Sequence, residues 1–191
     1  MGNKAARYLL LGQASLFGFL LICLALTPHF LLEYNEGGVS NYGLYAKTVV
    51  PYTLAFGLCG SLTLLAARFI PKGIASYKTL RISLAALGIL LIIVLVSTYP
   101  YKVNNALNVI HVDVGTALAF LELGLGMWFA LVLARDLKNI AFFAVQVIGF
   151  GLGVLTHFGV IHILFITEML TSFAFGIVLV RTVVRLTSSE Q

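Results

Sequence analysis

The sequence predicts an all-α polytopic membrane protein, a bundle of six transmembrane helices arranged as three hairpins. The 191-residue chain is 60% hydrophobic and only 10% charged, whereas a soluble domain is usually about 25% charged. Apolar runs long enough to span a bilayer, about 20 residues, recur at residues 8–27, 48–67, 82–99, 114–134, 139–156 and 159–180. Since only short loops remain, residues 1–191 are expected to form a single transmembrane domain.

Basic residues predict how the bundle is oriented. Ten of the twelve lie before the first run, between the second and third, between the fourth and fifth, or after the sixth: Lys4, Arg7, Arg68, Lys72, Lys78, Arg81, Arg135, Lys138, Arg181 and Arg185. Lys47 and Lys102 lie in the other gaps. Because Lys and Arg accumulate in cytoplasmic loops, we expect a cell-membrane protein with both termini in the cytoplasm. The net charge of +5 suits contact with anionic lipid rather than with nucleic acid.

The connecting segments explain where the helices begin and end. The second, fourth and sixth helices each end at an arginine, at Arg68, Arg135 and Arg181. The loops on the opposite side are about 28–47, 100–112 and 157–162, and the first two are rich in Gly, Asn and Pro, which favour turns. Cys23 and Cys59 fall inside predicted helices, where they are expected to behave as small apolar residues.

Two carboxylates, Glu122 and Glu168, lie within the predicted spans, and with Gln146 and Thr171 they form the set of candidate intramembrane polar residues. An ionisable group at mid-membrane costs about 2.5–3.5 kcal/mol on insertion scales and is therefore a candidate functional residue. The alternative is a structural role as a hydrogen-bonded side chain. For Glu168, the hydroxyl groups of Thr167 and Thr171 are the expected partners.

Counting along the helices predicts a contact between two of these residues. Glu122 follows His111 by eleven residues, and Gln146 precedes His157 by eleven, or about 16 Å at 1.5 Å per residue. If both histidines mark outer helix ends, the two side chains reach a similar depth. We therefore expect a hydrogen bond between Glu122 and Gln146 on adjacent helices.

Histidines and carboxylates gather at the predicted outer ends of the helices. The candidate ligand cluster comprises His29, Glu33, His111, Asp113, His157 and His162. Imidazole and carboxylate ligands suit zinc, and histidine also ligates haem. Ordinary zinc motifs, however, place two ligands at short helical spacing, and the nearest pair here is five residues apart. Solvated or capping histidines are the alternative.

Glycines and missing motifs narrow the function further. Gly149 and Gly153 match the small-xxx-small pattern of helix packing, which we interpret as packing within the bundle. The chain has no Walker A sequence, no G-x-G-x-x-G motif after a strand and no G-x-S-x-G motif. An enzymatic activity is therefore not expected.

Three features carry a family resemblance. A Ser-x-x-Gly turn at residues 40–43 lies in the first long loop, His111 opens the fourth helix, and Glu168 lies in the outer half of the sixth. In these features the chain resembles the six-helix DRAM/Frag/Sfk group of membrane proteins and related uncharacterised bacterial families. The chain departs from that pattern at Gly38 and Val39, where a proline would precede the serine. The resemblance implies a lipid-associated role rather than catalysis.

The leading hypothesis is a non-enzymatic multi-pass integral membrane protein that binds or organises lipid or a membrane partner. The expected partners are membrane lipid and either another membrane protein or further copies of the chain, without a cofactor. One alternative is a small proton-coupled transporter that uses Glu122 and Glu168. Another is a haem- or metal-binding membrane subunit that uses the outer histidines. A water-accessible cavity at Glu122 would favour the transporter, whereas a lipid-facing groove without such a cavity would favour the leading hypothesis.

Overall fold

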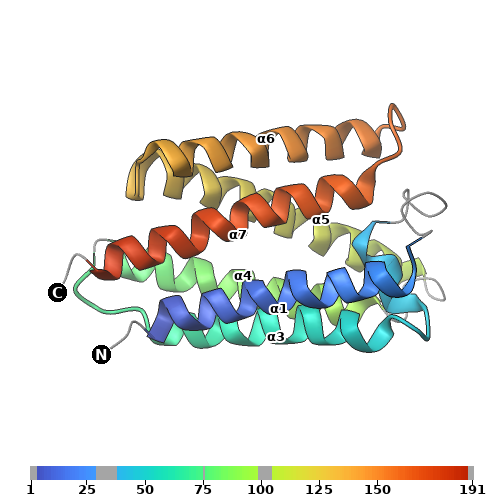
Figure 1. Cartoon of the computed structure of the whole chain (residues 1–191), viewed down its shortest axis with the longest axis horizontal. Helices are drawn as coiled ribbons and strands as arrows, with labels where there is room; N and C mark the ends of the chain where they lie inside the picture. The colour runs from blue at the N-terminus through green and yellow to red at the C-terminus, as the bar shows by residue number, and fades with distance from the viewer. Residues whose placement is uncertain (1–3, 29–37, 75, 99–104, 189–191) are drawn as a thin grey trace.

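The computed structural model describes residues 4–28, 38–74, 76–98 and 105–188. In these residues six long helices lie side by side (Figure 1): α1 (Lys4–Leu26), α3 (Val49–Arg68), α4 (Tyr77–Thr98), α5 (Asn105–Trp128), α6 (Leu137–His157) and α7 (Leu164–Ser188). A short 3₁₀ helix, η2 (Val39–Leu44), precedes α3, and a π-helical turn, η3 (Phe129–Leu133), continues α5. The predicted all-α class and the six apolar spans are confirmed.

Several helices extend beyond the predicted apolar runs. Helix α5 begins at Asn105 instead of residue 114, α4 begins at Tyr77 instead of 82, and α7 ends at Ser188 instead of 180. Hydropathy marks only the hydrocarbon region, about 30 Å thick, whereas the bilayer with its headgroups measures about 40–45 Å. The helices therefore continue through polar residues that the hydropathy pattern assigned to loops.

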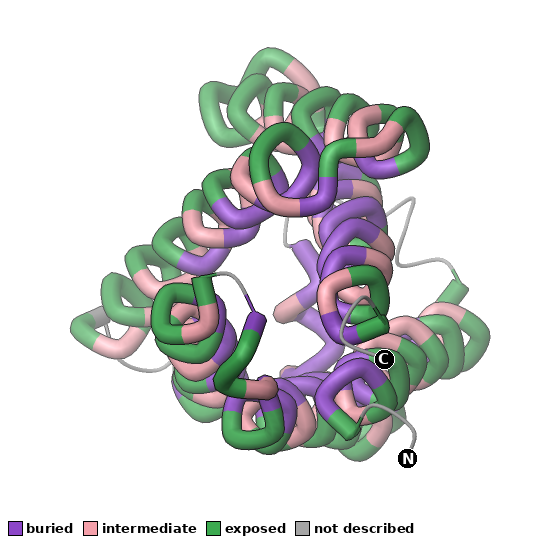
Figure 2. The backbone as a smooth tube through the Cα atoms, turned by 90° about the vertical axis from the view of Figure 1, so that its left-hand side faces the viewer, coloured by how far each residue is buried: buried purple, intermediate pink, exposed green. Residues whose placement is uncertain are grey.

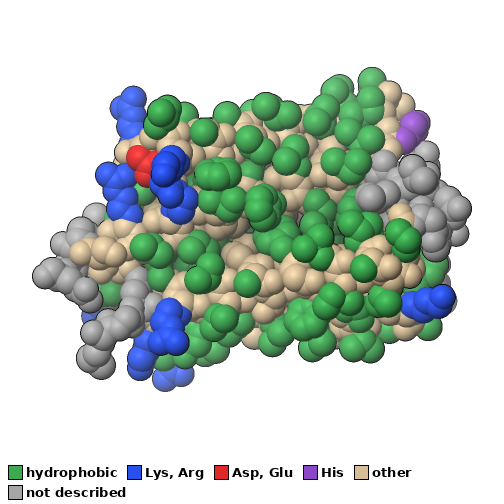
Figure 3. All heavy atoms as spheres, viewed as in Figure 1, with side chains coloured by type: hydrophobic (Ala, Val, Ile, Leu, Met, Phe, Trp, Pro, Cys, Tyr) green, Lys and Arg blue, Asp and Glu red, His purple; other side chains and the backbone are tan. Residues whose placement is uncertain are grey.

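The helices surround a common centre, toward which their buried faces point (Figure 2). The most extensive contacts join α1 to α3, α3 to α4, α4 to α5 and α6 to α7, while α7 meets α1 over a smaller area. The outward faces are rich in exposed hydrophobic side chains (Figure 3). Such a surface is unsuited to water and matches the predicted lipid environment.

The two ends of the bundle differ in charge. One end contains the start of α1, the end of α7 and the turns 69–74 and 134–136 (Figure 1). Most of the Lys and Arg side chains visible in Figure 3 lie there, and this end is here called the basic end. The opposite end, which contains η2, is called the loop end.

Helices α3 and α4 approach each other closely at Gly60 and Gly88. A Cβ atom on Gly88 would lie 2.9 Å from the carbonyl oxygen of Gly60, and one on Gly60 would lie 3.1 Å from the carbonyl oxygen of Gly88. Small residues at such crossings let helices pack closely where lipid provides no hydrophobic drive. This crossing holds α4 against the α1–α3 pair.

Replacing Gly88 by leucine is expected to separate α3 from α4. The added side chain meets backbone, which does not yield, so unfolding should become easier by about 1–3 kcal/mol. The matched control is Gly124→Leu, since a Cβ there has nothing within 4 Å. Thermal unfolding in detergent micelles measures both variants; equal midpoints would contradict the proposed importance of the crossing.

Candidate functional site

Glu168 binds the backbone of the first loop. Its Oε2 accepts a hydrogen bond of 2.6 Å from the backbone N–H of Val39, at the first residue of η2. The preceding residue, Gly38, has φ 65° and ψ −175°, a conformation that essentially only glycine adopts. A Cβ on Gly38 would lie 2.7 Å from the same carboxylate oxygen. The expected threonine partners are therefore wrong: Glu168 caps η2.

His111 joins three elements at the loop end. Its Nδ1 lies 2.9 Å from the Ser97 Oγ on α4, and its Nε2 lies 2.9 Å from the Ser40 Oγ on η2. The histidine does not open its helix, because α5 begins six residues earlier, at Asn105. Both ring nitrogens are engaged, so His111 acts here as a bridge between α4, α5 and η2.

The rest of η2 is packed into the end of the bundle. Tyr42 is fully buried, with its ring edge-on to Phe165 at 5.6 Å between centroids. The hydroxyl of Thr48 donates to the Tyr42 carbonyl at 2.7 Å. Gly43 lies against the Tyr52 ring and Thr98. The segment from Gly38 to Thr48 thus forms a cap over the loop end of the helices.

Glu122 is buried within the α5 span and has a partner on α7. The hydroxyl of Ser172 donates to its Oε2 at 3.0 Å, and 6% of the residue is exposed. Gln146 is fully buried, and neither of its side-chain polar atoms has a hydrogen-bond partner in the described part of the chain. The predicted hydrogen bond between Glu122 and Gln146 is therefore wrong.

The register of α5 and α6 explains this error. Gln146 rests against Gly126, where an added Cβ would meet the amide group, and Gly126 lies one turn beyond Glu122. Gly126 and Gln146 each lie ten residues from Asp136, in the tight turn at the basic end. That turn sets the register. The prediction assumed that His111 and His157 lie at the same depth at the ends of their helices. His157 does end α6, but α5 begins before His111, at Asn105, so the two histidines are not equivalent reference points.

Gly149 and Gly153 of α6 face α7, in keeping with the predicted packing within the bundle. A Cβ on Gly149 would lie 2.6 Å from the Thr171 Oγ1, and one on Gly153 would lie 3.4 Å from the Thr167 Oγ1. Thr167 itself donates to the Leu164 carbonyl at 2.8 Å. Thr171 is thus a buried packing residue between α6 and α7.

The candidate ligand cluster is described only in part. His29 and Glu33 lie outside the described residues. Asp113, His157 and His162 are exposed, and His111 bonds to two serines. Among the residues that the structure describes, no three His, Cys, Asp or Glu side chains are placed to hold a metal ion. The complete cluster stays a prediction.

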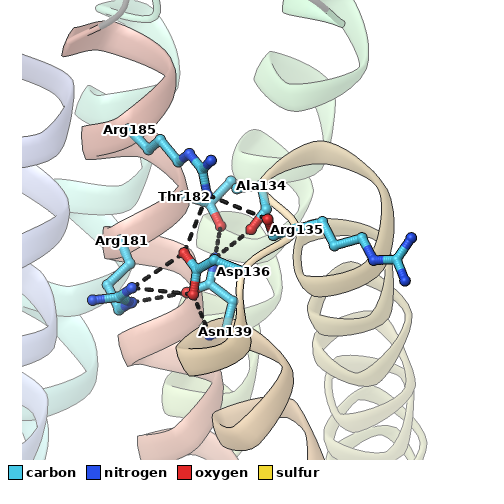
Figure 4. Close-up of polar contacts among 7 residues, drawn as sticks. All are labelled: Ala134, Arg135, Asp136, Asn139, Arg181, Thr182 and Arg185. Atoms are coloured by element: carbon cyan, nitrogen blue, oxygen red, sulfur yellow. Dashed lines mark hydrogen bonds and ion pairs between the residues drawn. The ribbon is translucent and has the colours of Figure 1, made fainter.

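The basic end contains a charged cluster that the sequence interpretation missed (Figure 4). Asp136 caps α6 by accepting from the backbone N–H of Asn139 at 2.8 Å. The same carboxylate pairs with Arg181 and Arg185, each at 3.2 Å. The Arg181 Nε donates to the Asn139 Oδ1 at 2.8 Å. An aspartate three residues before an asparagine at a helix start was the available signal, since aspartate is a preferred N-cap.

This environment shifts the titration of Asp136. The N–H of Asn139, and then the charge of Arg181, lower the pKa of Asp136 below its ordinary value. A carboxyl group with a lowered pKa stabilises the folded state at neutral pH, and the contribution disappears as the pH falls through that lowered value.

Two apolar grooves lie along the seam between α1 and α7. The groove nearer the basic end has a volume of about 360 Å³ and is lined by Leu10, Gln13, Ala14, Phe17, Phe173, Gly176, Ile177, Val180 and Arg181. The groove nearer the loop end has about 370 Å³ and is lined by Leu20, Leu21, Leu24, Phe165, Ile166, Met169, Leu170 and Phe173. Phe173 separates the two. Glu122, Gln146 and Glu168 line neither groove.

Comparison with protein-family models, curated proteins and solved structures finds no match. The resemblance to the DRAM/Frag/Sfk group therefore stays a prediction.

Replacing Glu168 by alanine should loosen the loop-end cap. The buried N–H of Val39 would lose its partner, at a cost of about 1–3 kcal/mol, so its amide hydrogen should exchange roughly tenfold faster. Glu168→Gln retains a carbonyl oxygen that can accept the hydrogen bond. In this variant the Val39 amide hydrogen should therefore exchange more slowly than in the alanine variant. Asp113→Ala, which removes an exposed carboxylate from the same end, is the control. Unchanged Val39 exchange in Glu168→Ala would refute the capping role.

Two substitutions of Asp136 should separate its cap from its ion pairs. Asparagine is also a good N-cap, so Asp136→Asn should lose only the pairs with Arg181 and Arg185, while Asp136→Ala should lose both contributions and unfold at a lower temperature. In the unmodified chain, the unfolding temperature should fall as acid protonates Asp136; that component should be absent in Asp136→Asn. Thermal unfolding measured across pH tests both expectations, which fail if the two variants coincide.

Proposed function

We propose that the protein is a non-enzymatic multi-pass membrane protein that binds lipid along the seam between α1 and α7. The observation that carries this proposal is the pair of apolar grooves between these helices. Their volumes lie in the range of small-molecule sites, about 300–1,000 Å³. Because the α1 and α7 surfaces around them are hydrophobic (Figure 3), a lipid chain reaches them sideways from the bilayer.

The shape of the grooves contributes more to holding a lipid chain than their hydrophobicity does. Lipid tails are as apolar as leucine, so a groove in a membrane protein holds a chain by close van der Waals packing. Phe17 and Phe173 supply such a surface, with their rings edge-on at 5.0 Å between centroids. Ala14 is exposed in the same lining, and Gly176 lies against the side chain of Gln13.

The buried polar groups support lipid binding over a proton-coupled carrier. Glu122 is paired with Ser172 and Glu168 with the Val39 backbone, and neither lines a groove. The resemblance to the DRAM/Frag/Sfk group implies a lipid-associated role as well. Ser40, His111 and Glu168, on which that resemblance rests, all contact η2 or belong to it.

The orientation belongs to the same proposal. We infer three hairpins in the cell membrane, with the basic end in the cytoplasm, because Lys and Arg accumulate on that side of membrane proteins. The groove nearer the basic end then opens to the inner leaflet, and the other groove opens to the outer leaflet.

Filling the first groove should displace its lipid. Ala14 is exposed in this groove, so Ala14→Phe adds a ring there without disturbing the buried core. Native mass spectrometry after purification in mild detergent should show markedly less retained phospholipid for Ala14→Phe than for the unmodified chain. The control Ala144→Phe adds the same ring to an exposed position on α6 outside both grooves. Equal lipid retention in the two variants would refute lipid binding at the seam.

A further inference from the structure

The groove nearer the basic end is apolar along its length and charged at one end. Arg181 is the single charged residue in its lining, and it lies at the basic end of α7 (Figure 4). Arg7 lies three residues before Leu10 on α1, a spacing that places both side chains on one helix face. Two arginines thus lie toward the basic end of the helices that form this groove, whose other lining residues are apolar except for Gln13.

Arg181 is held in place by the turn between α5 and α6. Its Nε donates to Asn139 and its Nη2 pairs with Asp136. These contacts fix the guanidinium while 36% of the side chain stays exposed. Fixing a guanidinium in advance lowers the conformational cost of binding an anion.

The local charge balance favours an anion at this position. Asp136 is shared by Arg181 and Arg185, so a single carboxylate faces two guanidinium groups. One positive charge of the trio stays uncompensated, and Arg7 adds another in the first turn of α1. Guanidinium groups bind phosphate oxygens through short charge-assisted hydrogen bonds.

The length of the groove matches one leaflet. Arg181 and Phe173 lie eight residues apart on α7, about 12 Å along the helix axis at 1.5 Å per residue. Half of a hydrocarbon core of about 30 Å is about 15 Å. A chain anchored by its headgroup at Arg181 would thus occupy the groove up to Phe173, close to the bilayer midplane.

We propose that this groove binds one acyl chain of an anionic phospholipid from the leaflet at the basic end, with the lipid phosphate at Arg181 and Arg7. The proposal rests on the proposed lipid-binding function and adds the headgroup class, the leaflet and the residues that select it. Apolar walls with a charged mouth fit an amphipathic anion, whereas a purely apolar ligand would make no use of the fixed guanidinium.

The test measures headgroup selection in nanodiscs of equimolar phosphatidylcholine and phosphatidylglycerol, by native mass spectrometry of the lipid that stays bound. The unmodified chain should retain phosphatidylglycerol preferentially. Arg181→Gln should reduce this preference roughly fivefold, the factor that corresponds to about 1 kcal/mol per basic residue at a lipid surface. Arg7→Gln, which leaves the Asp136 cluster intact, should reduce it in the same direction, and Arg181→Lys should restore part of it.

Arg185→Gln is the matched control. It removes one positive charge and one ion pair to Asp136, but Arg185 does not line the groove. An equal loss of preference in Arg185→Gln and Arg181→Gln would assign the effect to general surface charge and overturn the proposal. An unaltered preference for phosphatidylglycerol in both Arg181→Gln and Arg7→Gln would also overturn the proposal. The proposed lipid-binding function is tested separately: it would still be supported if Ala14→Phe displaced lipid.

A second arm separates the lipid headgroup from a free anion. Excess inorganic phosphate is added to the nanodiscs before analysis. Retention of phosphatidylglycerol in its presence supports a site that requires the acyl chain. Displacement by phosphate alone would show a site for a soluble anion and would overturn the proposal.

Discussion

Hydrocarbon offers no hydrogen-bond partner, and the polar groups of this chain are arranged accordingly. Backbone groups that cross a membrane must be satisfied within the chain, which is why the spans are helices. The hydroxyls follow the same constraint: those of Thr53, Thr98 and Thr156 each donate to the carbonyl four residues earlier. Glu122 and Glu168 bind a serine hydroxyl and a backbone N–H.

That constraint also explains why the two ends are built differently. At the loop end, the chain returns into the bundle as η2, whose first N–H groups need an acceptor, and Glu168 supplies it. At the basic end, the turn into α6 stays near water, so a charged cluster around Asp136 can form at a lower desolvation cost. Gln146 departs from the pattern, since its buried amide lies against Gly126 without a partner in the described residues.

The seam between α1 and α7 joins these features to the proposed function. The α6–α7 pair packs extensively within itself and meets α1 over a smaller area, so the contact between α1 and α7 leaves room for the grooves. Arg181 belongs to both the basic-end cluster and the groove lining. A lipid headgroup at this position would therefore contact the same residues that fix the turn between α5 and α6.

The sequence by itself determined the all-α class, the six spans, the charge asymmetry and the packing of Gly149 and Gly153 against a neighbouring helix. These follow from composition and periodicity, because lipid imposes the same requirement on every spanning segment. Only the tertiary structure decided the partners of Glu122, Gln146 and Glu168. Partners depend on helix register, which here follows from the turn at Asp136 and from the true start of α5 at Asn105. A hydropathy pattern indicates neither the turn at Asp136 nor the start of α5, and it does not indicate a groove between two helices.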